Sequence, residues 1–82
     1  MSFTGKTIND IASSFLKRIR KQNGLTEGEL AILLKVSQQQ VSRYENGKTQ
    51  LTIVKINQYL NIFGINWDDF IEGIKKKTKY DI

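Results

Sequence analysis

Two helix-start signals lie close together in the middle of the chain, and they constrain the fold more than any other feature of the sequence. Thr26 precedes Glu29 by three residues, and Ser37 precedes Gln40 by the same spacing. A hydroxyl residue followed three positions later by Glu or Gln is the pattern of a capping box, which begins a helix. Gly47 follows the second signal and suits the left-handed conformation that ends many helices. This stretch therefore predicts two short helices joined by a tight turn.

The rest of the sequence predicts three further helices and no strand. Caps and apolar stripes with a 3.6-residue period place them at about 8–22, 53–63 and 67–74, and the chain contains no proline. The apolar side chains expected to face the core in the first four helices are Ile8, Ile11, Ala12, Phe15, Leu16, Ile19, Leu30, Leu33, Leu34, Val41, Tyr44, Ile53, Ile56, Leu60 and Phe63. The predicted fold class is all-α, with five helices in one small domain.

The composition excludes several classes of function. With 82 residues, of which 39% are hydrophobic, the chain makes one small domain that buries about 60 to 65% of its unfolded surface. It contains no cysteine and no histidine, which excludes disulfides, histidine-containing zinc sites and histidine-based catalysis. No apolar run has the length of a signal peptide or a membrane helix. We therefore expect a soluble cytoplasmic protein that is not an enzyme and needs no metal and no small-molecule cofactor.

The net charge of +5 suits a polyanionic partner, and its distribution is uneven. Residues 1–64 carry nine positive and four negative side chains, residues 65–74 carry three negative ones, and residues 75–82 carry four positive and one negative. We expect an N-terminal arm over residues 1–7, a helical domain over 8–74 and a basic tail over 75–82. The tail lysines and Lys6 of the arm either hold nucleic acid or are solvated, and a solvated terminus is the commoner case.

The second helix of the central pair begins with three consecutive glutamines, Gln38, Gln39 and Gln40. A helix of seven to nine residues with amides exposed at its N-terminal end fits the major groove of DNA, where a glutamine can bond to both N6 and N7 of adenine. Three glutamines alone are more often solvated residues. Their position in a two-helix motif favours a DNA contact.

The same region resembles the Cro/CI-type helix-turn-helix family, also called XRE-like, and the likeness extends over roughly Ile8 to Ile74. The residues that carry it are Leu25-Thr26, Glu29-Leu30-Ala31, Val36-Ser37, the run from Val41 to Lys48, and the run from Gly64 to Phe70. Ala31 lies where the first helix of the motif approaches the second closely. The string from Ser37 to Glu45 also resembles the MrpJ-type regulators encoded with bacterial fimbrial operons. The resemblance implies a Cro/CI-repressor-like domain of five helices.

By this resemblance, residues 38–46 form the recognition helix. Gln38 and Gln39 then reach base edges, and Ser42 and Arg43 lie one turn further along the same face, where they reach bases or flanking phosphates. The expected phosphate contacts are Thr26, Gln40, Asn46, Lys48 and Thr49. Family members usually have a glutamine where this chain has Glu27, and a carboxylate there weakens the phosphate clamp. Arg20 and Glu45 occupy the positions of a partly buried ion pair that positions the recognition helix.

The implied function is a sequence-specific transcriptional regulator that binds double-stranded DNA as a homodimer on a two-half-site operator. The competing hypothesis is a protein-binding module, such as an antitoxin-like or accessory factor. The stripe of Trp67, Phe70, Ile71 and Ile74 is core first, and part of it is a candidate dimer seam. Lys17, Arg18 and Lys21 are interpreted as a solvated face rather than a DNA contact. Asp68, Asp69 and Glu72 are interpreted as offsetting the helix dipole rather than as a metal site or a general acid and base pair.

Overall fold

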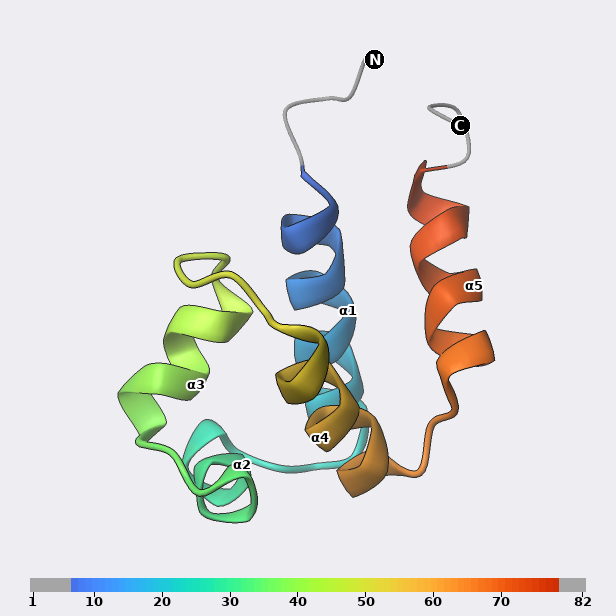
Figure 1. Cartoon of the computed structure of the whole chain (residues 1–82). Helices are drawn as coiled ribbons and strands as arrows, with labels where there is room; N and C mark the ends of the chain where they lie inside the picture. The colour runs from blue at the N-terminus through green and yellow to red at the C-terminus, as the bar shows by residue number, and fades with distance from the viewer. Residues whose placement is uncertain (1–6, 79–82) are drawn as a thin grey trace.

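The computed structural model describes residues 7–78 and shows five α-helices in that part of the chain (Figure 1). They are α1 (Ile8–Gln22), α2 (Glu27–Leu34), α3 (Gln38–Glu45), α4 (Ile53–Phe63) and α5 (Trp67–Thr78). The central helix α1 contacts α3, α4 and α5, while α2 packs against α3 and α4. Figure 1 shows α2 and α3 on one flank of the bundle and α5 on the other. The predicted all-α class is confirmed, whereas the predicted arm residues 1–6, including Lys6, and tail residues 79–82 lie outside the described residues.

Local capping determines where the helices begin. The Thr7 hydroxyl accepts a hydrogen bond from the Asp10 amide (3.1 Å), and the Asp10 carboxylate accepts one from the Thr7 amide (3.2 Å). The same reciprocal box forms between Thr26 and Glu29 at the start of α2. At α3 the Gln40 amide donates to the Ser37 hydroxyl (3.0 Å), but the return bond of the predicted box is not formed. The Gln40 side chain therefore remains available for other contacts.

The core lies where α1, α2, α3 and α4 meet, and α5 covers one side of it. Its buried members are Ala12, Leu16, Leu30, Ala31, Leu34, Val41, Tyr59, Leu60 and Phe70. Aromatic rings join α5 to α1, since Phe15 and Phe70 meet edge to face with centroids 5.3 Å apart. The Phe15 ring lies directly over Gly73, where a β-carbon would overlap it. Glycine at this position therefore permits the close approach of α5 to α1.

The predicted orientation of α4 was partly wrong. Ile53, expected in the core, is 74% exposed, while Tyr59, which was not singled out, is fully buried. Seven of the eleven residues of α4 are apolar, so the stripe extends almost around the helix and does not identify the buried side. The same ambiguity affects Leu33 and Ile8, which were expected inward and are 52% and 58% exposed.

The last helix is longer than expected. It was predicted to end near residue 74, but α5 continues to Thr78 and carries Lys75, Lys76 and Lys77 in its last turn. Positive side chains at this end offset the negative end of the helix dipole, which favours the extra turn. Within residues 7–78, no helix combines the length and apolar character needed to cross a membrane.

Candidate nucleic-acid interface

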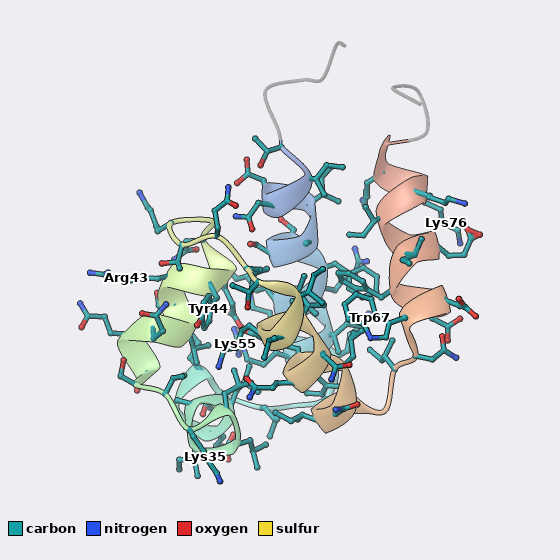
Figure 2. All side chains as sticks on the ribbon, in the orientation of Figure 1. Lys35, Arg43, Tyr44, Lys55, Trp67 and Lys76 are labelled. Carbon is teal, nitrogen blue, oxygen red and sulfur yellow. The ribbon has the colours of Figure 1, made fainter. Side chains whose placement is uncertain are left out.

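The outward side of α3 presents polar side chains to solvent. Helical spacing places Gln38, Gln39, Ser42, Arg43 and the C-cap residue Asn46 within one continuous arc, which we call the α3 outer face. All of them are exposed except Ser42, which is half-buried. The Arg43 side chain points away from the bundle (Figure 2). The structure therefore brings together the four residues that the sequence assigned to base contact, and the bundle leaves them accessible.

The underside of α3 is anchored in the core. Val41 is fully buried, and the half-buried Tyr44 meets the Tyr59 ring edge to face at 6.5 Å. The Lys55 ammonium of α4 lies 5.9 Å from the centroid of the Tyr44 ring, on the side that faces α4 (Figure 2). These contacts set the rotation of α3 about its own axis. That rotation determines which side chains face outward.

A buried ion pair holds the C-terminal end of α3. The Arg20 guanidinium grips the Glu45 carboxylate in two places, Nε to Oε2 at 2.7 Å and Nη2 to Oε1 at 3.0 Å. Arg20 Nη1 also donates to the Leu25 carbonyl at 2.7 Å, in the segment before α2. The hydrogen bond to Glu45 raises the pKa of Arg20 above its ordinary value, although burial opposes this shift. One guanidinium thus links α1, the α1–α2 connection and α3. The ion pair lies at the two positions that the family resemblance implied.

The first turns of α2 and α3 lie against each other. A β-carbon on Gly28 would lie 3.2 Å from the Gln38 side-chain oxygen and 3.8 Å from the Thr26 hydroxyl oxygen. The Gln38 amide therefore rests beside the start of α2, and the absence of a side chain at residue 28 makes room for it. The sequence did not single out Gly28, because a glycine within a helix gives no local sign of the partner it accommodates.

The start of α2 offers fewer groups to a phosphate than expected. The Thr26 amide already donates to the Glu29 carboxylate (2.8 Å), and the Thr26 hydroxyl accepts from the Glu29 amide (3.0 Å). The hydroxyl proton of Thr26 is the donor that remains. Glu27 is half-buried, and its negative charge contributes to the raised pKa of Arg20, although less than Glu45 does.

The loop after α3 carries the remaining predicted phosphate contacts. Gly47 has a φ of +71°, and the Lys48 amide donates to the Arg43 carbonyl at 2.9 Å, which closes the helix end. Lys48 is exposed, and Thr49 is half-buried. The side-chain amide of Asn46 donates a hydrogen bond to the Ser42 hydroxyl (3.3 Å). This bond joins two residues that are predicted to contact DNA.

The start of α1 holds this loop in place. The Leu51 amide donates to the Asn9 side-chain oxygen at 2.9 Å, and the Asp10 carboxylate lies where a β-carbon on Gly47 would be. Asn9 and Leu51 are 42 residues apart, and no local pattern signals a contact over that separation.

The charge of this surface suits a polyanion. Arg43 and Lys48 are exposed, and the other outward side chains of α3 are neutral amides and a hydroxyl. The one carboxylate of α3, Glu45, is turned inward and paired with Arg20. No negative side chain of α3 therefore faces an approaching phosphate backbone.

Most of the predicted dimer seam packs within its own protomer. Phe70 is 4% exposed and belongs to the core, and Trp67 and Ile74 are half-buried. The Trp67 indole donates to the Asn57 side-chain oxygen at 3.0 Å and meets the Phe70 ring edge to face. Ile71, at 46% exposed, is the one member of the stripe that is exposed rather than half-buried or buried.

Two short helices joined by a tight turn, the second with a buried underside and an exposed polar face, define a helix-turn-helix domain. The chain belongs to the helix-turn-helix family HTH_3, whose family model matches residues 16–70. This match confirms the Cro/CI-type resemblance. Comparison with curated proteins gives no match.

Two crystal structures of the clp gene regulator ClgR from Corynebacterium glutamicum share the fold. One is 20% identical, with a TM-score of 0.79, and the match covers 87% of this chain and 92% of that chain. The other is 19% identical, with a TM-score of 0.82, and the match covers 92% of this chain and 80% of that chain. At this level of identity, the likeness extends to the arrangement of the helices.

Proposed function

We propose that the protein is a sequence-specific DNA-binding transcription regulator that binds a two-half-site operator as a homodimer. The observation that carries this proposal is the α3 outer face, an exposed row of hydrogen-bonding side chains on a helix held by the buried Arg20–Glu45 pair. Membership of the helix-turn-helix family and the shared fold with a gene regulator support it. The narrower relation to MrpJ-type fimbrial regulators stays a prediction.

Base readout is assigned to the first turn of α3 and the residues one turn beyond it. Gln38 and Gln39 are exposed at the helix start, where a glutamine can donate to N7 and accept from N6 of one adenine. Ser42 and Arg43 follow on the same face and reach bases or the sugar-phosphate backbone. Because the underside of α3 is fixed, these side chains approach the groove without reordering the helix.

Phosphate contacts position the protein on the duplex and make its affinity depend on salt. The groups proposed for this role are Thr26, Gln40, Asn46, Lys48 and Thr49. If each protomer meets three or four phosphates, a dimer meets about six to eight, and affinity falls roughly 10³ to 10⁴-fold between 50 and 200 mM salt.

The experiment that tests the proposal selects bound sites from a random pool of double-stranded DNA. We expect an enriched sequence with twofold symmetry, whose half-site centres lie about one helical turn, or 34 Å, apart. Repeating the selection with the Gln39→Ala variant should relax the preference at one position in each half-site. A pool without any enriched sequence would contradict sequence-specific binding, and an enriched site without symmetry would contradict the dimer.

One observation favours a second candidate, a protein-binding module such as an antitoxin-like or accessory factor. Ile32 and Leu33 are adjacent on α2 and are 77% and 52% exposed. Exposed neighbouring aliphatic side chains are typical of protein contact surfaces. Stoichiometric recovery of a partner in a pull-down, lost on Ile32→Glu, together with a failed DNA selection, would favour this candidate.

A further inference from the structure

The outward side of α4 differs in composition from the outward side of every other helix in the described part of the chain. Helical spacing places Ile53, Val54, Asn57, Gln58 and Asn61 within one continuous arc, which we call the α4 outer face. All five are exposed, and none is charged. The outward sides of α1, α2, α3 and α5 each carry at least one exposed charged residue within residues 7–78.

The first turn of α4 concentrates the exposed apolar surface. Ile53 and Val54 are 74% and 69% exposed, and both carry branched aliphatic side chains. The one charged residue of α4, Lys55, is half-buried and turned to the Tyr44 ring of α3. Charge is depleted at the centre of protein interfaces, where apolar groups are desolvated. The α4 outer face has this composition, with two aliphatic residues in its first turn and neutral amides in the turns that follow.

A second copy of this chain fits the α4 outer face better than a charged partner does. The chain has a net charge of +5, so two copies repel each other wherever their basic surfaces meet. A neutral face avoids that repulsion, and in a twofold interface the same patch meets itself, so it must be self-complementary. Ile53 and Val54 packed against their own counterparts, with amides bonding at the rim, satisfy this condition.

The position of α4 in the chain also suits a dimer that binds DNA. α4 begins shortly after the loop that carries Lys48, and its side chains touch α3 through Tyr44. In Figure 1, α3 lies on the outer flank beside the first turn of α4, whereas α5 lies on the far flank. A contact through α4 therefore keeps both copies of α3 close to the twofold axis. If α4 packs against its counterpart, α4 lies about half an interhelical distance from the axis and α3 about one and a half, or roughly 12 to 15 Å. This is close to the 17 Å that is about half of the proposed half-site separation.

We infer that the α4 outer face is the surface through which two copies of this chain associate, with Ile53 and Val54 beside the twofold axis. The inference rests on the proposed function, because it assigns the partner surface of the proposed homodimer. It replaces the stripe on α5, whose Phe70 is already buried in its own protomer and whose neighbours include exposed carboxylates and lysines.

Self-association of the full chain tests the inference directly. Val54→Glu places like charges opposite each other across the twofold axis, and we expect sedimentation equilibrium to show association at least about tenfold weaker. The fold should survive, because Val54 is exposed and a carboxylate suits the first turn of a helix. Ile71→Glu on α5 and Ile32→Glu on α2 are matched controls that should associate like the wild type, with circular dichroism confirming equal helix content. Unchanged association of Val54→Glu, or weaker association of Ile71→Glu, would overturn the inference.

Cross-linking provides a second measurement that does not depend on weakening the interface. The chain has no cysteine, so Ile53→Cys and Val54→Cys each introduce a single thiol. We expect mild oxidation to give a covalent dimer with at least one of them, because residues beside a twofold axis lie close to their own counterparts, within the roughly 7 Å between Cα atoms that a disulfide allows. Ile32→Cys and Ile71→Cys should remain monomeric. Covalent dimers from these controls alone would overturn the inference.

DNA binding separates this inference from the proposed function. On DNA with one half-site of the selected sequence, Val54→Glu should bind like the wild type, and on DNA with two half-sites it should lose the additional affinity that dimerisation supplies. Wild-type binding to both DNAs by Val54→Glu would overturn the inference and leave the proposed function intact. Association through α4 without any DNA preference would support the inference and contradict the proposed function.

Discussion

α3 and α4 are short helices with one exposed and one buried side, and each departs from the usual distribution of residues in a different way. α3 buries the carboxylate of Glu45 and exposes amides, whereas α4 buries the aromatic ring of Tyr59 and exposes Ile53 and Val54. Burial of a charge and exposure of aliphatic side chains both oppose the usual distribution of residues between core and solvent. In these two helices, both departures indicate a role beyond filling the core. In α3 the role is to orient a polar surface, and in α4 we propose that it is to bind a second copy.

The largest effect is expected where α3 is anchored. Glu45→Ala leaves the buried Arg20 guanidinium without its partner, and we expect the free energy of unfolding to fall by about 3 to 5 kcal/mol in urea titrations followed by circular dichroism. The double variant Arg20→Met with Glu45→Met removes both charges and should be much less destabilised. A loss below about 1 kcal/mol for Glu45→Ala would show that the pair behaves like a surface ion pair, and the anchoring role would be wrong.

Substitution of one exposed glutamine on each outer face tests which of the two faces contacts DNA. Gln39→Ala should weaken binding to the selected operator by about 1 to 3 kcal/mol and hardly change binding to random DNA. Gln58→Ala removes the same exposed group from α4 and should leave binding to a single half-site unchanged. Both are measured by fluorescence anisotropy at one fixed salt concentration. An equal loss for Gln39→Ala on random DNA would contradict base readout.

Removal of the buried Tyr59 hydroxyl of α4 is expected to stabilise the protein. Tyr59 is fully buried, and no described residue forms a hydrogen bond with its hydroxyl, so Tyr59→Phe should raise the free energy of unfolding by about 1 kcal/mol at pH 7. Tyr44→Phe, at a half-buried site, should change it less. A clear destabilisation of Tyr59→Phe would show that the hydroxyl has a stabilising partner.

The same variant has a predictable pH dependence. Burial raises the pKa of Tyr59 well above its ordinary value of 10, while the unfolded chain ionises near that value. The stability associated with the protonated hydroxyl is therefore complete below pH 10 and is lost as the pH rises further. The advantage of Tyr59→Phe should grow above pH 10 by up to about 1.4 kcal/mol per pH unit, measured by urea titrations at each pH. A constant difference between the two proteins would contradict the shifted pKa.

The smallest effects are expected at two residues that end helices in the left-handed conformation, one after α2 and one after α4. Lys35 ends α2 with a φ of +61°, whereas Gly64 ends α4 with a φ of +68°. A side chain in this conformation costs roughly 1 kcal/mol, which glycine avoids, although glycine also gains freedom in the unfolded chain. Lys35→Gly should therefore stabilise the protein by about 0.5 kcal/mol, and Gly64→Ala should destabilise it by about 1 kcal/mol. Thermal unfolding measures both, and a stabilising Gly64→Ala would contradict the argument.

The parts of the fold that depend on neighbouring residues could be predicted from the sequence. Thr7, Thr26, Ser37, Thr52 and Asn66 each cap the amide three positions later, and these bonds are local, so the starts of all five helices followed from the pattern. Because the cap sets where α3 begins, the exposure of its glutamine side chains could be predicted as well.

The parts that depend on distant packing could not be predicted from the sequence. An apolar stripe does not state which side of a helix has a neighbour, so Ile53 and Leu33 were expected to be buried and are exposed. The contacts of Gln38 with Gly28 and of Asn9 with Leu51 join separate elements and have no periodic signature. The Arg20–Glu45 pair was expected only because the family often has a pair at these positions.

The hydrogen bond from the Leu51 amide to the Asn9 side chain joins the loop after α3 to the first turn of α1. The loop that carries Lys48 is tethered to the opening turn of α1, so ordering of one lowers the entropy cost of ordering the other. Such coupling is reciprocal. If a duplex immobilises Lys48, hydrogen exchange in the first turn of α1 should slow, and Asn9→Ala should reduce the slowing without altering any side chain proposed to contact DNA.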